Sequence, residues 1–95
     1  NEEQKILPEQ FSLEQNYPNP FNPMTNISFT LPYKQKIKLS VHNSLGEEIA
    51  VLANSIYNEG KHEIVFDGSN FSSGIYYCNI IADDLKQSIK MILLK

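Results

Sequence analysis

The stretch Tyr17-Pro18-Asn19-Pro20-Phe21-Asn22-Pro23 decides how this chain folds, and we call it the proline corner. Its three prolines fix the backbone φ angle and remove three amide donors, so neither a helix nor a central strand can form there. Residues that precede a proline are also driven towards extended conformations. The rings of Tyr17 and Phe21 gain free energy by burial. The stretch therefore predicts a rigid, extended corner whose two rings plug one end of a packed domain.

Apolar residues alternate with polar ones along most of the chain after the corner. Ile27, Phe29 and Leu31 follow this period of two up to Pro32, which indicates a half-buried strand. Similar runs occupy residues 36–42, 48–52, 62–66 and 88–94, and a short first strand is expected around residues 11–13. Residues 75–82 are apolar on both faces, as in a central strand of a packed sheet.

Turn residues separate these runs and set the fold class. They are Asn43-Ser44-Leu45-Gly46, Asp67-Gly68, Ser73-Gly74 and the hairpin dipeptide Asp83-Asp84. About seven short strands without a helical period predict an all-β fold, an immunoglobulin-like antiparallel β-sandwich.

Length and charge exclude several classes of protein. The chain has 95 residues, which is one domain, and 8 basic against 11 acidic residues give a net charge of -3. This balance argues against nucleic-acid binding, and no apolar run approaches the ~20 residues of a membrane helix. Residues 1–10 are polar and read as a linker stub, which leaves 11–95 as the domain. The absence of an initiator Met or signal peptide indicates a piece of a longer protein.

No set of residues predicts catalysis or metal binding. His42 is expected on the solvent side of its strand and His62 is expected to be partly buried, and neither has the spacing of metal ligands. Asp83 and Asp84 are expected to be solvated turn formers, and Cys78 a buried hydrophobe. There is no nucleophile elbow or phosphate loop. We therefore expect neither an enzyme nor a bound cofactor.

The last predicted strand loses its alternation towards the end. Met91, Ile92, Leu93 and Leu94 are all apolar, and Lys95 follows. Two readings stay open. The strand is covered on both faces by its own domain, or it offers an apolar face or an open edge to a partner.

Six motifs then occur in a fixed order. They are Phe-Ser-Leu-x-Gln-Asn-Tyr-Pro-Asn-Pro-Phe-Asn-Pro at 11–23, Thr25-x-Ile27-x-Phe29-x-Leu31-Pro32, Leu39-x-Val41-x-Asn43-x-x-Gly46-x-x-Ile49, Gly60-x-His62-x-Ile64-x-Phe66-Asp67-Gly68, Ser73-Gly74-Ile75-Tyr76-Tyr77 and Lys90-Met91-x-Leu93-Leu94-Lys95. In this order they resemble the type A C-terminal sorting domain of the type IX secretion system, found at the end of cargo proteins in Bacteroidetes. The chain departs from that pattern at His42 and Phe66, where other aromatics are usual, and at Cys78.

This resemblance implies a non-catalytic secretion signal. A larger N-terminal cargo would reach the periplasm by its own signal peptide, and the outer-membrane type IX machinery would then recognise the C-terminal domain. The cargo would end at the cell surface or in the medium. In relatives a sortase-like peptidase removes the domain and couples the cargo to a lipopolysaccharide anchor, and such a cut would fall within residues 1–10.

The resemblance also assigns roles to residues. It places the signal near the C-terminal end, at Gly74, Tyr76, Lys90, Met91, Leu93, Leu94 and Lys95. A receptor would capture residues 88–95 by strand addition at an edge, with Lys90 and Lys95 fixing the register. The proline corner, Gly46, Asp67 and Gly68 would have structural roles.

Two other functions compete with this one. The chain is also similar to passive immunoglobulin-like spacers, such as the small domain of flagellar hook-capping proteins or accessory domains of glycoside hydrolases. A position at the very C-terminus of the parent protein favours the sorting domain over such a spacer. Carbohydrate binding would need a planar row of exposed aromatics, but the tyrosines are scattered and there is no Trp.

Overall fold

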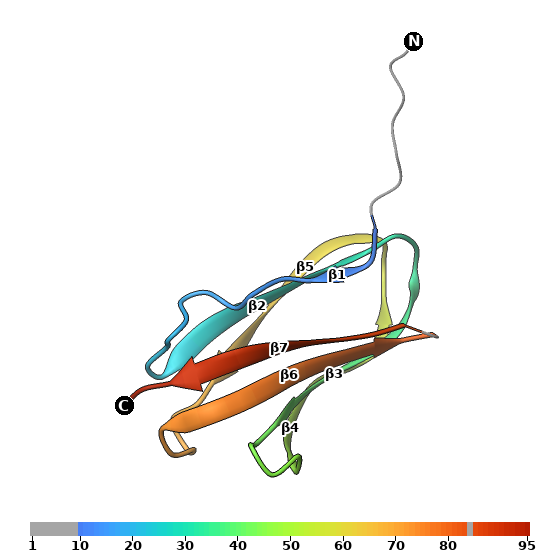
Figure 1. Cartoon of the computed structure of the whole chain (residues 1–95). Coiled ribbons are helices and arrows are strands. Elements are labelled where there is room, and N and C mark those ends of the chain that lie inside the picture. Colours follow the sequence, from blue (N-terminus) through green and yellow to red (C-terminus); the bar gives the residue numbers. More distant parts are fainter. Residues whose placement is uncertain (1–9, 84) are drawn as a thin grey trace.

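The computed structural model describes residues 10–83 and 85–95, which form seven strands in two antiparallel sheets (Figure 1). The strands are β1 (Ser12–Leu13), β2 (Met24–Leu31), β3 (Gln35–His42), β4 (Glu48–Tyr57), β5 (Gly60–Asp67), β6 (Gly74–Ala82) and β7 (Leu85–Leu93). One sheet has the order β1-β2-β5 and the other the order β4-β3-β6-β7. The predicted all-β sandwich is confirmed, and its architecture is compatible with an immunoglobulin-like fold.

Strand β4 is the element that the sequence pattern describes least well. It continues to Tyr57, five residues beyond the predicted run. Its pairing with β3 shifts register between Leu39 and Ser40 and again between Val41 and His42. A bulge places two residues of one strand opposite one of its partner, so the alternation of faces is interrupted. The interruptions explain why a period of two shows only part of this strand.

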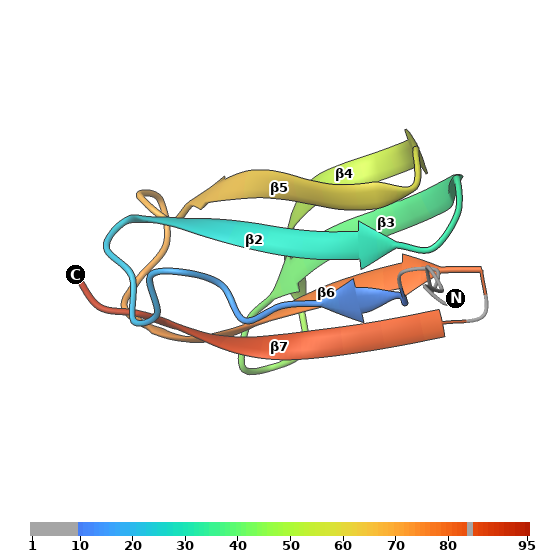
Figure 2. The ribbon, with the colours of Figure 1, turned by 90° about the horizontal axis from the view of Figure 1, so that it is seen from above.

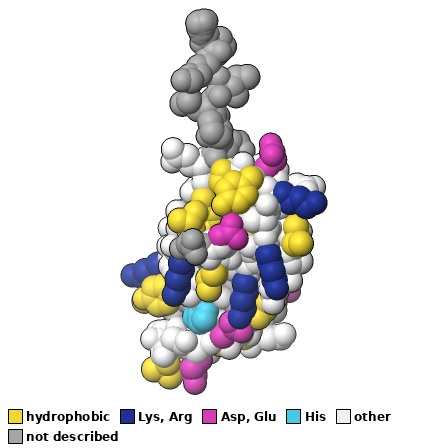
Figure 3. Space-filling view, turned by 90° about the vertical axis from the view of Figure 1, so that its right-hand side faces the viewer, with side chains coloured by type: hydrophobic (Ala, Val, Ile, Leu, Met, Phe, Trp, Pro, Cys, Tyr) yellow, Lys and Arg dark blue, Asp and Glu magenta, His cyan; other side chains and the backbone are white. Residues whose placement is uncertain are grey.

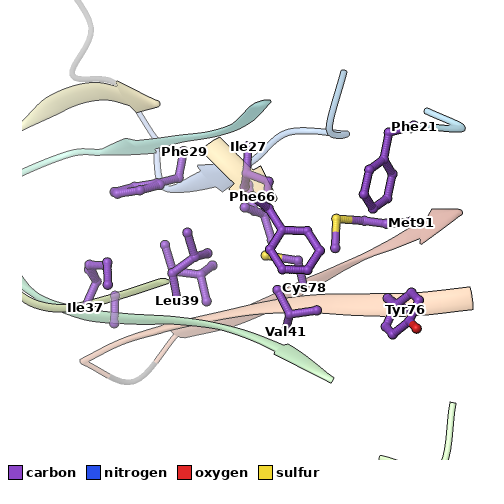
Figure 4. Close-up of a cluster of buried hydrophobic side chains, with 14 of the residues drawn as sticks. Phe21, Ile27, Phe29, Ile37, Leu39, Val41, Phe66, Tyr76, Cys78 and Met91 are labelled. Carbon is purple, nitrogen blue, oxygen red and sulfur yellow. The ribbon is translucent and has the colours of Figure 1, made fainter. Parts of the chain in front are cut away.

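The core lies between the sheets and contains the inward residues of every long strand. Ile27 and Phe29 of β2 face Ile37 and Leu39 of β3, and Cys78 of β6 lies beside them (Figure 4). These side chains are 0–1% exposed. The predicted burial of Cys78 is therefore confirmed. Burial of such residues contributes roughly 1.5–3 kcal/mol for each large side chain.

Strand β6 is central in its sheet, as predicted, but it is covered on one face only. Its outward residues Ile75, Tyr77 and Ile81 are 39–45% exposed. Apolar residues on both faces therefore marked its central place in the sheet but not burial on both sides, because the second layer of the sandwich lies against the inner face.

The remaining predictions concern the turn between β6 and β7 and the start of the chain. Ala82 pairs with Leu85, so a two-residue turn joins β6 to β7, and Asp83 adopts a φ of 48° there. Asp84 and residues 1–9 of the predicted linker 1–10 lie outside the described residues, while Gln10 is exposed. Figure 2 shows β1 lying along β7, with which it is in contact.

Candidate functional site

The proline corner and the end of β7 lie at the same end of the sandwich (Figure 1). Phe21 is buried at 2% exposure and packs edge-on against Phe66, with ring centroids 5.9 Å apart. Figure 4 shows its ring close to Met91. The prediction that Phe21 plugs one end of the domain is confirmed.

Tyr17 does not join this plug, so that part of the prediction is wrong. Its side chain is 78% exposed. The Tyr17 and Asn26 backbones exchange two hydrogen bonds of 3.0 and 2.8 Å. Opposed residues of an antiparallel pair point to the same face. Since Asn26 faces solvent between buried Thr25 and Ile27, the ring of Tyr17 faces solvent too.

Two buried polar residues, which sequence reasoning missed, hold the corner from beneath. The Asn16 amide donates to the Pro18 carbonyl oxygen at 3.2 Å and to the Thr25 hydroxyl at 3.0 Å. The Thr25 hydroxyl in turn donates to the Pro18 carbonyl at 2.8 Å. A buried polar group without a partner is costly, so this network stabilises one path of the chain through the corner. The sequence feature that could have indicated this network is Thr25, a polar residue at an inward position of β2, whose other inward residues are apolar.

Backbone hydrogen bonds join the corner to the last strand. Phe21 N donates to Ile92 O at 2.9 Å, and Leu94 N donates to Phe21 O at 3.0 Å. The side-chain oxygen of Asn19 accepts from Ile92 N at 2.9 Å. Two residues before Ile92, the Gln15 amide donates to Lys90 O at 2.7 Å. The proline corner therefore acts as a short partner strand for the tail.

This pairing contradicts the expected capture of residues 88–95 through an open edge. Four edge-facing backbone groups of this segment already have partners in residues 15–21, namely Lys90 O, Ile92 N, Ile92 O and Leu94 N. Nearer the start of β7, the Gln87 side chain accepts from Leu13 N and donates to Phe11 O. A strand added by a receptor would first have to displace Phe21 from the core.

The predicted signal residues all lie on β6, on β7 or directly after β7, but they differ in exposure. Met91 and Leu93 are fully buried, and Tyr76 is 8% exposed with its hydroxyl donating to Ser72 O at 2.6 Å. Gly74 pairs with Leu93 at the start of β6. The members with exposed side chains are Lys90, Leu94 and Lys95.

The turn after β5 links Lys95 to the corner. Lys95 Nζ donates to Ser69 O at 2.6 Å, and Lys95 N donates to the Ser73 hydroxyl at 2.9 Å. Hydrogen bonds from the Ser69 hydroxyl and backbone amide, with a smaller contribution from the charge of Lys95, hold the pKa of Asp67 below its usual value of 3.8. Gly68 N donates to Pro23 O at 2.8 Å. A Cβ at Gly68 would lie 3.1 Å from Leu93 Cδ2 and 3.2 Å from Phe21 Cε2, so this turn packs closely on both parts.

The surroundings of the remaining candidate residues indicate structural roles. Gly46 has a φ of +85° in the turn between β3 and β4, a conformation that favours glycine. His42 lies on the outward side of its strand, as predicted, and is half-buried, with a ring nitrogen 3.1 Å from the Ser40 hydroxyl. His62 is half-buried as predicted and packs on Phe29. Burial raises the pKa of Cys78 to about 12.

Within residues 10–83 and 85–95, no group of three or more His, Cys, Asp or Glu side chains could hold a metal ion. The same part of the chain contains no helix long and apolar enough to cross a membrane. The hydrogen bonds described above make the candidate site a surface in which the proline corner supports an exposed tail.

Comparison with known proteins identifies the family of the chain. The sequence profile of a family described as "Secretion system C-terminal sorting domain" matches residues 15–94. No curated protein and no solved structure matches the chain. The profile match covers both the proline corner and the tail, and with them most of the chain. The chain therefore belongs to the family of C-terminal sorting domains of the type IX secretion system.

Proposed function

We propose that this domain is the C-terminal sorting signal of a larger cargo protein and performs no catalysis of its own. Family membership supports a type IX sorting signal. Such a signal implies contact with the type IX machinery, a cargo on the N-terminal side, and export to the cell surface or the medium. The observation that carries the proposal is the hydrogen-bonded unit of corner and tail, since it holds the end of the chain in one defined position.

The secretion machinery would bind the side chains that remain exposed when the proline corner and the tail are hydrogen-bonded to each other. Leu94 is 55% exposed, and Lys90 and Lys95 flank it with positive charge. Met91 and Leu93 would act indirectly, because their burial fixes the path of the strand between the exposed residues. Recognition would therefore use a preformed surface, which avoids the entropic cost of ordering a flexible tail.

Removal of the domain would occur on its N-terminal side. A sortase-like peptidase would cut within residues 1–10, ahead of the first strand at Ser12. The neighbouring Gln10 is exposed, and accessible backbone outside packed elements is the usual site of cleavage. The cargo would then be coupled to a lipopolysaccharide anchor or released.

Secretion of a fusion protein tests the proposal. Residues 1–95 are fused behind a periplasmic reporter in a host with type IX secretion, and surface reporter is measured by its accessibility to added protease. We expect Leu94→Ser combined with Lys95→Ala to reduce surface reporter about tenfold or more. Deletion of residues 90–95 is a poorer test, because it also removes Met91 and Leu93 from the core.

The matched control changes an exposed leucine and an exposed lysine that lie outside the tail. Leu45 is 82% exposed in a turn, and Lys34 is exposed in a loop. Leu45→Ser with Lys34→Ala should leave secretion unchanged. Wild-type secretion by the Leu94→Ser, Lys95→Ala protein, with thermal unfolding showing both variants folded, would reject recognition through the tail. A wild-type fusion that stays in the periplasm would reject the sorting function itself.

A further inference from the structure

The outer face of the four-stranded sheet combines exposed apolar side chains with lysines, and we call it the basic face. Its centre is the stripe Ile75, Tyr77 and Ile81 on β6, which is 39–45% exposed. Lysines of the neighbouring strands flank the stripe on both sides. Ile81 pairs with Lys38 of β3 and Lys86 of β7, and Tyr77 pairs with Lys90 of β7.

This combination is unusual for the solvated side of a sheet. The outward residues of an antiparallel sheet with one wet face are normally polar, yet three of the four outward residues of β6 between Ile75 and Ile81 are large and apolar, with Asn79 between Tyr77 and Ile81. Figure 3 looks onto the end of the sandwich with the β6–β7 turn, where lysine, acidic and hydrophobic side chains lie side by side. An apolar stripe with a charged border is the pattern of an interaction surface.

Charge is distributed unevenly between the two sheets. Four of the eight lysines, at positions 36, 38, 86 and 90, lie on the basic face although the chain carries a net charge of -3. Glu48 of β4 pairs with Lys38 at 3.0 Å. On the outer side of the other sheet, Lys61 pairs with Glu14, and Glu63 and Asp67 add further negative charge. A partner for the basic face should therefore be acidic.

Two hollows on the same face offer directional hydrogen bonding. A cavity of about 440 Å³ is lined by Asn79, Ser88, Lys86, His42 and Tyr77, and by Asn43, whose amide is already bonded to Leu45 and Glu47 in its own turn. The Asn79 oxygen accepts from the Ser88 hydroxyl, which leaves the Asn79 amide nitrogen as a donor. A second cavity of about 290 Å³ lies between Lys36, Lys38, Asn54 and Ile81, and Asp83 adds one acidic side chain to its lining. Amide side chains carry both donors and acceptors, as does a peptide backbone. An anionic lipid headgroup presents chiefly acceptors, so the amides favour a polypeptide as the partner.

We propose that the basic face binds an acidic, partly apolar polypeptide segment of the secretion machinery. From Ile75 to Ile81 the stripe is about 20 Å long at ~3.4 Å per residue, which suits an extended segment of about seven residues. Apolar side chains of that segment would lie on Ile75 and Ile81, and its carboxylates would meet the lysines on either side. This inference rests on the proposed function and adds a second contact surface, continuous with the tail at Lys90.

Charge reversal in the fusion assay tests this surface separately from the tail. Lys36→Glu with Lys86→Glu places two negative charges on opposite sides of the stripe. Lys34→Glu with Lys61→Glu is the control, because it changes the net charge equally but lies off the basic face. We expect the first pair to lower surface reporter about tenfold, with the control pair close to wild type. A photocrosslinking amino acid replacing Ile81 should form an adduct with an acidic segment of a machinery protein, whereas one replacing Val65 of β5 should not.

Each other outcome rejects the inference. Wild-type secretion by the folded Lys36→Glu, Lys86→Glu protein would show that the face is not used. Salt-sensitive binding of the wild-type domain to phosphatidylglycerol vesicles, lost in that variant and without a protein adduct at position 81, would assign the face to lipid. Self-association in sedimentation velocity that the variant abolishes would assign it to a second copy of the chain. Failure of the wild-type fusion to reach the surface would reject the proposed function, and this inference with it.

Discussion

The backbone nitrogen of Phe21 lies 2.9 Å from the carbonyl oxygen of Ile92, so the proline corner is hydrogen-bonded to the last strand. The same residue buries its ring against Phe66 at the end of the core. Phe21 therefore closes the backbone edge of β7 and fills the space beneath it. Any loss of the ring should loosen the tail as well as the core.

Truncation of this ring should be far more destabilising than truncation of the other aromatic of the corner. Phe21→Ala should lower the free energy of unfolding by about 3–5 kcal/mol, because it leaves a cavity between the sheets. Tyr17→Ala should change it by about 0.5 kcal/mol or less, since its ring is 78% exposed. Urea denaturation of the two proteins measures the difference. Equal losses would mean that the corner does not bury Phe21 selectively.

The hydrogen bond between Asn19 and Ile92 leads to a prediction about amide exchange at Ile92. Asn19→Ala leaves the Ile92 amide without the side-chain oxygen that accepts from it at 2.9 Å. A hydrogen bond contributes about 0.5–1.5 kcal/mol net, so amide exchange at Ile92 should accelerate by about twofold to tenfold. Hydrogen exchange followed by NMR measures the exchange rate at Ile92 directly. Asn22→Ala, a change at another exposed asparagine of the corner, should leave exchange at Ile92 unaltered; equal acceleration in both would point to general loosening of the corner.

Period-two alternation predicted most of this fold because it reports which face of a strand is buried. It placed Ile27, Phe29 and Leu31 in the core correctly. It could not distinguish Tyr17 from Phe21, since their different exposure depends on the pairing of Tyr17 with Asn26. Periodicity carries no information about which segment lies along the free edge of a strand. The closed edge of β7 therefore appears only in three dimensions.

The close packing at Gly68 predicts a steric effect of a single methyl group. In Gly68→Ala the new Cβ would lie 3.1 Å from Leu93 Cδ2 and 3.2 Å from the Pro23 carbonyl oxygen. Such overpacking should lower the free energy of unfolding by about 1–3 kcal/mol. Leu93→Val removes a methylene from the same space, so the double variant should lose less than the sum of the two single losses. Strict additivity in the thermal or urea denaturation would place the cost of Gly68→Ala elsewhere.

Asp67 should titrate below its usual range. Hydrogen bonds from Ser69, assisted by the charge of Lys95, lower the pKa of this carboxyl from 3.8 in the folded chain. Its contribution to stability is therefore present above pH 3.8 and is lost as the pH falls through the folded pKa. In an NMR titration Ser69→Ala should raise the midpoint towards 3.8, and Lys95→Ala should raise it less. A larger effect of Lys95→Ala would show that charge outweighs the hydrogen bonds.

Cys78 should make the fold sensitive to alkali. Burial raises the pKa of its thiol from 9.0 to about 12, so the unfolded chain releases this proton at a lower pH than the folded chain does. Between pH 9.0 and about 12 the unfolded state binds fewer protons, and the free energy of unfolding must fall as the pH rises, by up to about 1.4 kcal/mol per pH unit for this group. Lysines and tyrosines titrate in the same range, so the measurement is the difference between wild type and Cys78→Ala. Urea denaturation at pH 8 and pH 10 should show a steeper decline in the wild type. Parallel declines, or rapid reaction of the folded wild type with a thiol reagent at pH 8, would show that the thiol is accessible to water.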